Sequence, residues 1–309
     1  MLKKSILIAL AALLAACSQP PDRQQAVASA HPLATQAGIE ILNKGGNAFD
    51  AAVAVSATLA VVEPYSSGMG GGGFWLLYRA ADQHSVMVDG REVAPINAQR
   101  DMYLDDKGEI IPNLSIDGPL AAGIPGQPAA LDHIAKQYGK LPLRDTLAPA
   151  IRAAQNGFAV TEHYQRMAKF RLEALRASAD AAAIFLHDNE VPELGHVIRQ
   201  PDLANSISAM AERGRDGFYR GKVAEQLLHG VQYAGGIWVA EDFNNYEVKE
   251  RAPIVSEYRG YKITSVPPPS SGGVAITGML RMLDALNWHD QSGAMKTHLL
   301  VEVMRRAYR

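Results

Sequence analysis

Residues 63–75 read EPYSSGMGGGGFW, and residues 88–95 read VDGREVAP. Four consecutive glycines lead directly into an apolar run, so they predict a tight backbone turn that feeds a strand. Glycine permits positive φ and lets another group approach the backbone closely. Arg91 follows one strand later, flanked by Asp89 and Glu92. Because a guanidinium group can hold a planar carboxylate through two parallel hydrogen bonds, the two segments together predict a pocket for a small acid.

Two helices are predicted before the glycine turn, at residues 33–43 and 48–62. The first has apolar residues at four-residue spacing. Asn47 can cap the second, with Asp50 in the favourable first turn. The second helix is apolar almost all round, which is typical of a helix buried between layers.

Strands are predicted near residues 73–78 and 85–89. A buried helix beside consecutive hairpin strands favours a layered α and β architecture. The other expected elements are helices near 129–138 and 143–156, a mostly helical region at 161–230, a more β-like region at 235–255, a turn and buried strand at 259–266, and helices at 273–286 and from 298 onward.

The composition describes one large or two ordinary soluble globular domains. The chain has 309 residues, of which 48% are hydrophobic and 20% are charged. Its formal net charge of −2 offers no basic footprint, so nucleic acid is not an expected partner.

The N-terminus predicts export and lipid attachment. Residues 1–16 combine two lysines with an apolar stretch that is too short to span a bilayer, as in a signal peptide. The stretch ends Leu-Ala-Ala before Cys17, the only cysteine, which is the arrangement of a bacterial lipobox. Residues 17–30 would then be a polar tether and residues 31–309 the folded domain. The alternative is a signal peptide that happens to contain a cysteine. A periplasmic, lipid-anchored protein is expected, and Ser18 favours the outer membrane.

The glycine run does not match a nucleotide-binding loop. A dinucleotide fingerprint needs a strand before the glycines and a helix after them, and this chain has the reverse order. The glycines are therefore interpreted as a packing and turn device. The nine histidines form no metal-binding pattern, so no metal or organic cofactor is expected.

Several motifs occur together in a fixed order and resemble the γ-glutamyltranspeptidase (glutathione hydrolase) family, from residue 31 to residue 309. They are HPLAT at 31–35, GGNAFDAAVA at 45–54, the two segments quoted above, GIPG at 123–126, PPPSSGG at 267–273 and EVMRRAY at 302–308.

The resemblance implies an N-terminal-nucleophile hydrolase, with a layered α-β-β-α fold that this chain supplies only in part. It implies transfer or hydrolysis of γ-glutamyl amides such as glutathione, through a threonine acyl-enzyme that forms after autocatalytic cleavage of a proenzyme. Arg91 stands where the family's arginine binds the α-carboxylate of the γ-glutamyl group. The expected partner is a small subunit cut from the same precursor, which makes a heterodimer.

The family's nucleophile is not expected among these residues. In the family it is a threonine that begins a motif reading Thr-Thr-His, and of the seven threonines only Thr297, which precedes His298, faintly resembles that motif. A truncated record or a split gene is the expected reason, and this chain alone is expected to be inactive and poorly soluble. The segment 267–273 can be read as an oxyanion hole or as a stiff entry into a helix, and the second interpretation is preferred.

Other functions remain open at this stage. A related acylase, such as a cephalosporin acylase of glutaryl type or a poly-γ-glutamate depolymerase, shares the fold that the resemblance implies. A non-catalytic lipoprotein remnant would bind glutamate or glutathione without turnover. A periplasmic solute-binding protein is disfavoured, because the apolar second helix and the glycine turn do not suggest hinge-linked repeats.

Overall fold

The first two helices form as predicted. In a computed structural model that describes residues 25–309, α2 spans Pro32–Asn43 and α3 spans Ala48–Val62. Residues 1–24, which include Cys17 and the expected signal peptide, lie outside the described residues. Over the described range, no helix is both long enough and apolar enough to cross a bilayer.

Asp50 fixes the start of α3 and ties it to a distant part of the chain. Its carboxylate accepts the Asn47 N–H at 2.8 Å, and the Asn47 side chain accepts the N–H groups of Phe49 and Asp50, so the predicted cap is a reciprocal capping box. The same carboxylate accepts the N–H groups of Lys140 and Leu141 at 3.0 and 3.2 Å. Asp50 is fully buried, so these donors replace the water that its charge would otherwise need.

His31 caps α2 through its ring, so this residue of the HPLAT motif has a structural role. Nδ1 accepts the Leu33 N–H at 3.2 Å, which places the ring proton on Nε2. Burial lowers the pKa of His31, and the Glu63 carboxylate offsets part of that effect. The folded chain therefore favours the neutral ring.

We expect the protein to lose stability as the pH falls below about 6.5, the usual pKa of histidine, because the unfolded chain then binds a proton that the folded chain does not. The loss is complete once the pH is below the lowered pKa of the folded ring. His31→Asn keeps an N-cap acceptor but cannot titrate, so its thermal midpoint should fall less between about pH 7.5 and about pH 5.5. Equal shifts in the two proteins would contradict this expectation.

The predicted hairpin forms two strands of a three-stranded antiparallel sheet. β1 (Gly73–Arg79) pairs with β2 (His84–Gly90), with Leu77 opposite Val86. β5 (Lys249–Arg251) joins the other edge of β2, so the strand order is β1-β2-β5. β1 is therefore an edge strand within the described chain.

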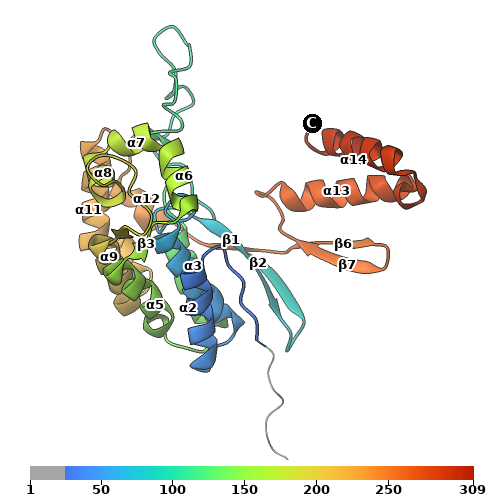
Figure 1. Cartoon of the computed structure of the whole chain (residues 1–309), viewed down its shortest axis with the longest axis horizontal. Helices are drawn as coiled ribbons and strands as arrows, with labels where there is room; N and C mark the ends of the chain where they lie inside the picture. The colour runs from blue at the N-terminus through green and yellow to red at the C-terminus, as the bar shows by residue number, and fades with distance from the viewer. Residues whose placement is uncertain (1–24) are drawn as a thin grey trace, which may run out of the picture.

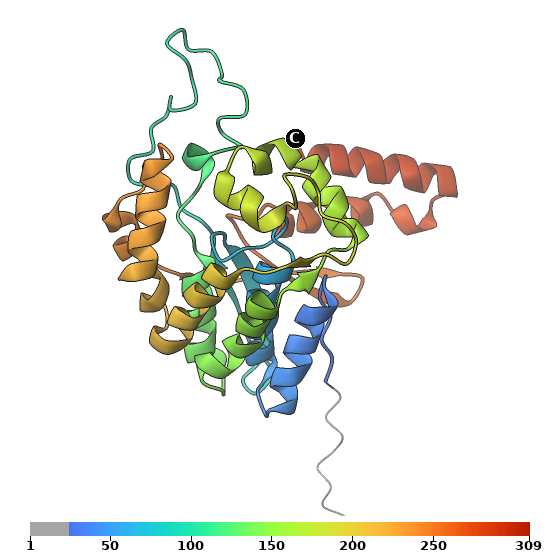
Figure 2. The ribbon, with the colours of Figure 1, turned by 60° about the vertical axis from the view of Figure 1, so that its left-hand side comes forward.

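Helices cover one face of this sheet (Figures 1 and 2). α4 (Gln127–Tyr138) packs on β2 and on α3, while α5 (Leu143–Asn156) packs on α3 and on α9 (Pro201–Arg213). In α3 only Ala48 is exposed, which confirms the prediction of a helix buried between layers. The shared core includes Val53, Ala57, Val61, Val88, Ile134, Leu147 and Ile207.

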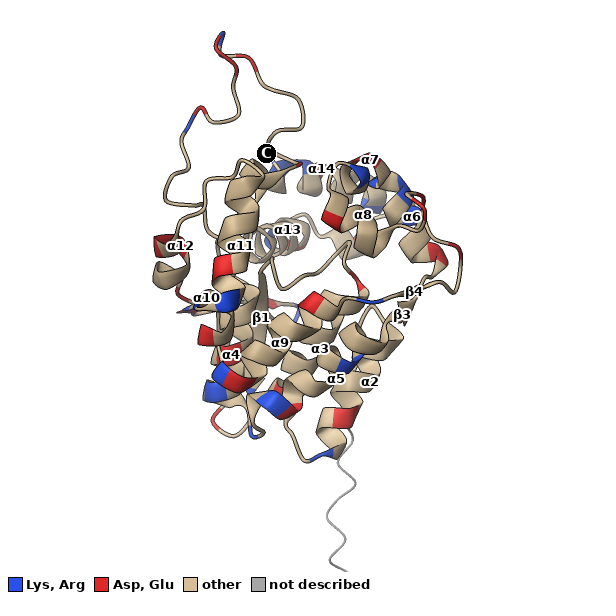
Figure 3. Cartoon of the chain, turned by 90° about the vertical axis from the view of Figure 1, so that its left-hand side faces the viewer, with Lys and Arg blue, Asp and Glu red and all other residues tan. Residues whose placement is uncertain are grey.

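The helical region predicted at 161–230 is confirmed. Besides α9, it contains α6 (Glu162–Phe170), α7 (Leu172–Arg176), α8 (Ala179–Phe185), α10 (Asp216–Tyr219) and α11 (Lys222–Tyr233). A small sheet of β3 (Phe158–Ala159) and β4 (Val197–Ile198) joins the two ends of the segment that carries α6, α7 and α8. Acidic and basic residues are mixed along the helices in the view of Figure 3.

The expectation of a β-like region at 235–255 is only partly right. The region contains the short helix α12 (Ala240–Asn245) before β5. Asp242 starts this helix, because its carboxylate accepts the Val239 N–H at 2.8 Å and the Ile96 N–H at 2.7 Å. A cap made by one buried acid outweighs the strand preference of the surrounding apolar residues.

The C-terminal part forms two hairpins that project from the helical body in Figure 1. They are the strands β6 (Ile254–Tyr258) and β7 (Tyr261–Ser265) and the helices α13 (Gly272–Ala285) and α14 (Gly293–Ala307), with the 3-10 turn η2 (Trp288–Asp290) between the helices. The predicted strand at 259–266 exists, but the expectation that it is buried is wrong, since Tyr261 is 75% exposed. α14 also begins five residues before the expected start, because Ser292 caps it.

Candidate functional site

The glycine turn between α3 and β1 is held against the start of α4. The Gly71 N–H donates to the Gly68 oxygen at 3.0 Å, and the Gly71 oxygen accepts the N–H groups of Gly126 and Gln127, both at 2.9 Å. The two motifs GGGG and GIPG, which are separate in the sequence, are therefore in direct contact.

Close approach, and not positive φ, is what requires glycine at positions 72 and 126. A Cβ at Gly72 would overlap the carbonyl oxygen of Gly90, and a Cβ at Gly126 would overlap the hydroxyl of Tyr246. No glycine between 68 and 73 has a positive φ. The packing part of the interpretation is confirmed at Gly72, whereas a Cβ at Gly70 would meet nothing within 4 Å.

Arg91 follows the last residue of β2 and carries an exposed guanidinium group. This group lies over the Phe74 ring, with Cζ 5.8 Å from the ring centroid, and its Nε is 3.6 Å from a Glu92 carboxylate oxygen. The Arg91 side chain is 57% exposed. Asp89, the other acidic neighbour, accepts instead from Arg251 Nε at 2.8 Å. The Arg91 guanidinium thus keeps donors free for an incoming carboxylate.

The backbone of Arg91 is fixed by hydrogen bonds, although its side chain is exposed. Its N–H donates to Asp89 Oδ1 at 3.1 Å, and its carbonyl oxygen accepts the Tyr246 hydroxyl at 2.8 Å. Burial, with smaller contributions from Asp89 and Glu92, raises the pKa of Tyr246 well above its usual value, so the phenol remains a donor. Sequence reasoning did not single out Tyr246, because no local pattern links it to a residue 155 positions away.

The other residues considered from the sequence either lead into a helix or make contacts within their own helix. Residues 267–271 lead into the N-terminus of α13, as the preferred interpretation of that segment proposes. Thr297 lies inside α14, where its hydroxyl donates to the Gly293 oxygen at 3.3 Å. Glu302 pairs with Arg305 and Arg306 on the same helix, at 2.9 and 2.7 Å.

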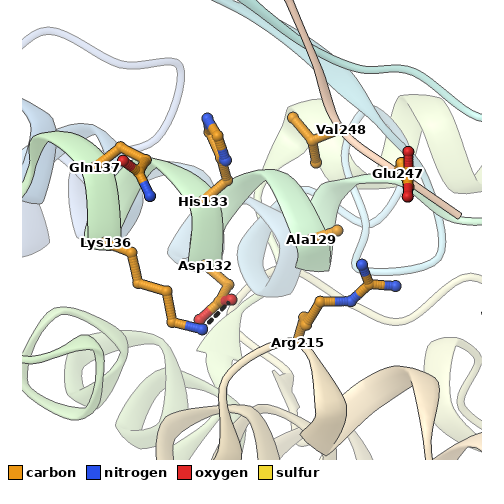
Figure 4. Close-up of a pocket in the computed structure, with 8 residues that line it drawn as sticks. All are labelled: Ala129, Asp132, His133, Lys136, Gln137, Arg215, Glu247 and Val248. Atoms are coloured by element: carbon orange, nitrogen blue, oxygen red, sulfur yellow. Dashed lines mark hydrogen bonds and ion pairs between the residues drawn. The ribbon is translucent and has the colours of Figure 1, made fainter.

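A pocket of about 250 Å³ lies on α4, beside Arg215 (Figure 4). Asp132 and Lys136 form an ion pair at 2.7 Å within it, while His133 binds Glu250 outside it at 2.8 Å and Arg215 donates to the Tyr246 carbonyl oxygen at 2.9 Å. The second oxygen of Asp132 is buried without a hydrogen bond and faces Gly214, where a Cβ would lie 2.6 Å away. This oxygen packs against the backbone at Gly214, so it does not by itself mark a ligand site.

A larger cavity of about 980 Å³ opens between Tyr65, the loop at Asp117 and the helices α6, α7 and α8. Its lining is mainly apolar, with Phe170 and Phe185 among its residues, and an ion pair between Arg171 and Asp117 lies in its wall. This cavity is large enough for a small ligand, but the arginine in its wall, Arg171, is already paired with Asp117.

The sequence profile described as Gamma-glutamyltranspeptidase matches residues 34–309. A glutathione hydrolase proenzyme of Escherichia coli is 41% identical over 263 residues, which are 85% of this chain and 45% of that protein. The chain spans about half the length of the curated relatives that it matches.

Two solved structures share its backbone. The γ-glutamyltranspeptidase of Helicobacter pylori superposes with a TM-score of 0.88 at 37% identity, over 94% of this chain and 84% of that one. A cephalosporin acylase from Bacillus halodurans superposes with a TM-score of 0.80 at 30% identity, over 94% of this chain and 56% of that one. The expected α/β fold class is confirmed. On profile, identity and backbone together, the chain belongs to the γ-glutamyltranspeptidase family.

Proposed function

We propose that this chain is the part of a γ-glutamyltransferase or glutathione hydrolase that holds the α-carboxylate of the γ-glutamyl group. The observation that carries the proposal is the exposed Arg91 guanidinium on a peptide held at both ends, with Glu92 at 3.6 Å as its nearest ion-pair partner in the described chain. A carboxylate placed against this group would gain two parallel, charge-assisted hydrogen bonds.

The proposed reaction cleaves a γ-glutamyl amide such as glutathione. A threonine hydroxyl, supplied by a segment outside these 309 residues, attacks the γ-carbonyl carbon; the amide bond breaks, and the leaving amine takes the hydroxyl proton. Water then hydrolyses the ester to free glutamate, or the amine of an acceptor takes the γ-glutamyl group. Arg91 forms no bond in these steps, and its contribution is to orient the substrate.

A related acylase is the second candidate, and the superposition with the Bacillus halodurans cephalosporin acylase favours it. A side-chain acid such as glutaryl would present its distal carboxylate to Arg91 in the same way. Turnover of glutaryl amides without turnover of γ-glutamyl amides would select this candidate.

The uncovered surfaces support a second polypeptide as partner. Side chains alternate along β1, so Leu77 faces the helices while Leu76 and Tyr78 face outward, and Tyr78 is 60% exposed. The C-terminal hairpins likewise expose Val255, Tyr261, Val274, Ile276, Leu300, Val301 and Met304. The segment between β2 and η1 (Pro119–Ala121) also projects from the body (Figure 1). We propose that a small subunit from the same precursor covers these faces and pairs with the free edge of β1.

A comparison of two polypeptides tests the proposed function. Residues 18–309 alone should associate through the uncovered faces and release no p-nitroaniline from γ-glutamyl-p-nitroanilide. The complete precursor that contains these residues should be soluble, cut itself and release the product. Activity of the isolated chain would refute the need for a second polypeptide. Glutathione binding without turnover by the processed precursor would instead favour a non-catalytic lipoprotein.

We also propose that Cys17 carries the lipid that anchors the protein in the periplasm, at the outer membrane. The support is the sequence Leu-Ala-Ala-Cys at the end of the apolar stretch. Wild-type protein should incorporate labelled palmitate and sediment with outer membranes, and Cys17→Ser should do neither. Unchanged sedimentation of the unlabelled variant would overturn the anchor.

A further inference from the structure

The position of Arg91 is fixed mainly at its backbone, and only weakly through its side chain. The side chain has one ion pair at 3.6 Å and one ring contact. The backbone N–H and the backbone carbonyl oxygen of Arg91 each form a hydrogen bond. The direction in which the side chain leaves the sheet is therefore set by the two groups that bind the peptide, which are Asp89 and Tyr246.

Tyr246 is itself rigidly placed. Its residue is 3% exposed, and its ring stacks on Tyr219 with centroids 5.7 Å apart and planes 9° apart. The Tyr219 hydroxyl donates to the Pro125 oxygen at 2.7 Å, and Arg215 donates to the Tyr246 carbonyl oxygen at 2.9 Å. The absence of a side chain at Gly126 is what allows the phenol to reach Arg91.

Asp89, which binds the N–H of Arg91, is held in place by residues that closely follow Tyr246 in the chain. Asp89 is 7% exposed, and Arg251 of β5 binds its second oxygen at 2.8 Å while its first accepts the Arg91 N–H. Asp89 is also paired with Lys249 in the sheet. Residues 246–251 thus reach both ends of the Arg91 peptide, directly or through Asp89.

We propose that Tyr246 is a positioning residue for Arg91, an inference that rests on the proposed function. Its hydroxyl locks the carbonyl of Arg91, so that the guanidinium leaves the sheet across Phe74 and meets the substrate carboxylate in a bidentate arrangement. Binding of this kind is sensitive to shifts of about 1 Å, because both hydrogen bonds must form together. Loss of the hydroxyl should weaken substrate binding and leave the chemical step unchanged.

The test is Tyr246→Phe in the complete precursor, which keeps the ring stack and removes only the hydroxyl. We expect KM for γ-glutamyl-p-nitroanilide to rise about tenfold while kcat stays within about twofold. Tyr164→Phe is the matched control, since Tyr164 is equally buried at 3% exposure and its hydroxyl also donates to a carbonyl, that of Phe185, at 2.7 Å. The control should leave KM unchanged.

A double variant separates positioning from general loss of structure. In an Arg91→Ala background, Tyr246→Phe should raise KM no further, because no guanidinium remains to be positioned. An unchanged KM in the single variant, or the same rise in both backgrounds, would overturn the inference. If Tyr246→Phe does not yield soluble protein, Asp89→Asn in the same two backgrounds gives the equivalent test from the other end of the peptide.

The outcomes also distinguish failure of the role proposed for Tyr246 from failure of the proposed γ-glutamyl activity. A processed wild-type precursor that neither binds nor cleaves γ-glutamyl compounds would end the proposed function. A wild-type enzyme that is active and sensitive to Arg91→Ala, but insensitive to Tyr246→Phe, would end only the role of Tyr246.

Discussion

Arg91→Ala in the complete precursor should raise KM for glutathione about 30-fold or more. The proposed small subunit would desolvate the pair that Arg91 forms with the substrate, and loss of one partner from such a pair costs about 2 kcal/mol or more. Autocatalytic cleavage should proceed normally, since the proposed role of Arg91 is only to hold the substrate. Arg91→Lys should recover part of the loss, because an ammonium group keeps the charge but not the planar pair of donors. Steady-state kinetics on processed enzyme, with processing followed by gel electrophoresis, give the result.

Arg100→Ala is the matched control for this experiment. Arg100 is also an exposed arginine beside an acid, with its Nε 3.6 Å from Asp101 and its side chain 94% exposed. Exposed pairs of this kind contribute about 0–1 kcal/mol at most, so its KM should stay within about twofold of wild type. If the two variants behave alike, Arg91 is a surface residue and does not belong to the site.

Asp50→Ala should lower the free energy of unfolding by about 3 kcal/mol or more, the largest stability effect that we expect from one side chain. The change leaves the N–H groups of Asn47, Lys140 and Leu141 without their acceptor inside the protein. Asp50→Asn should cost less, because an amide oxygen can still accept part of this set. Urea unfolding of the complete precursor, followed by tryptophan fluorescence, measures both losses.

Asp145→Asn provides the control for Asp50. Asp145 is also an acid in the first turn of a helix, α5, but its side chain is 45% exposed and its nearest partner is Arg144 at 3.8 Å. It should change the unfolding free energy by no more than about 0.5 kcal/mol. A similarly small effect for Asp50→Asn and Asp50→Ala would show that the buried carboxylate is dispensable.

Local signals in the sequence predicted the elements that begin and end with local chemistry. The bounds of α3 and α5 follow from Asn47 and Gly157, because a capping side chain and a terminal glycine act within a few residues. The hairpin of β1 and β2 is equally local, since a short polar turn joins strands of matched length. Arg91 was found in the same way, as part of a contiguous motif.

Nonlocal contacts could not be predicted. β5 pairs with β2 across a long stretch of helices, and nothing near Lys249 indicates that pairing. Asp242 binds the N–H of Ile96, 146 positions away, so its capping role depends on tertiary structure as well as on the helix that it starts. The contact of Tyr246 is also nonlocal. An isolated tyrosine carries no sequence motif, and the role proposed for it depends on which carbonyl oxygen its hydroxyl meets after folding.

The hydrogen bond between Arg91 and Tyr246 closes a loop of 155 residues. A ribosome must therefore deliver the chain as far as β5 before Arg91 is anchored at both backbone groups, and the entropic cost of that closure makes the proposed site one of the later features to form. Shortened chains that end before Tyr246 would keep the helical layers but hold Arg91 on a loose strand end. Occupancy by a glutamyl ligand would then report that folding of the long intervening segment is complete.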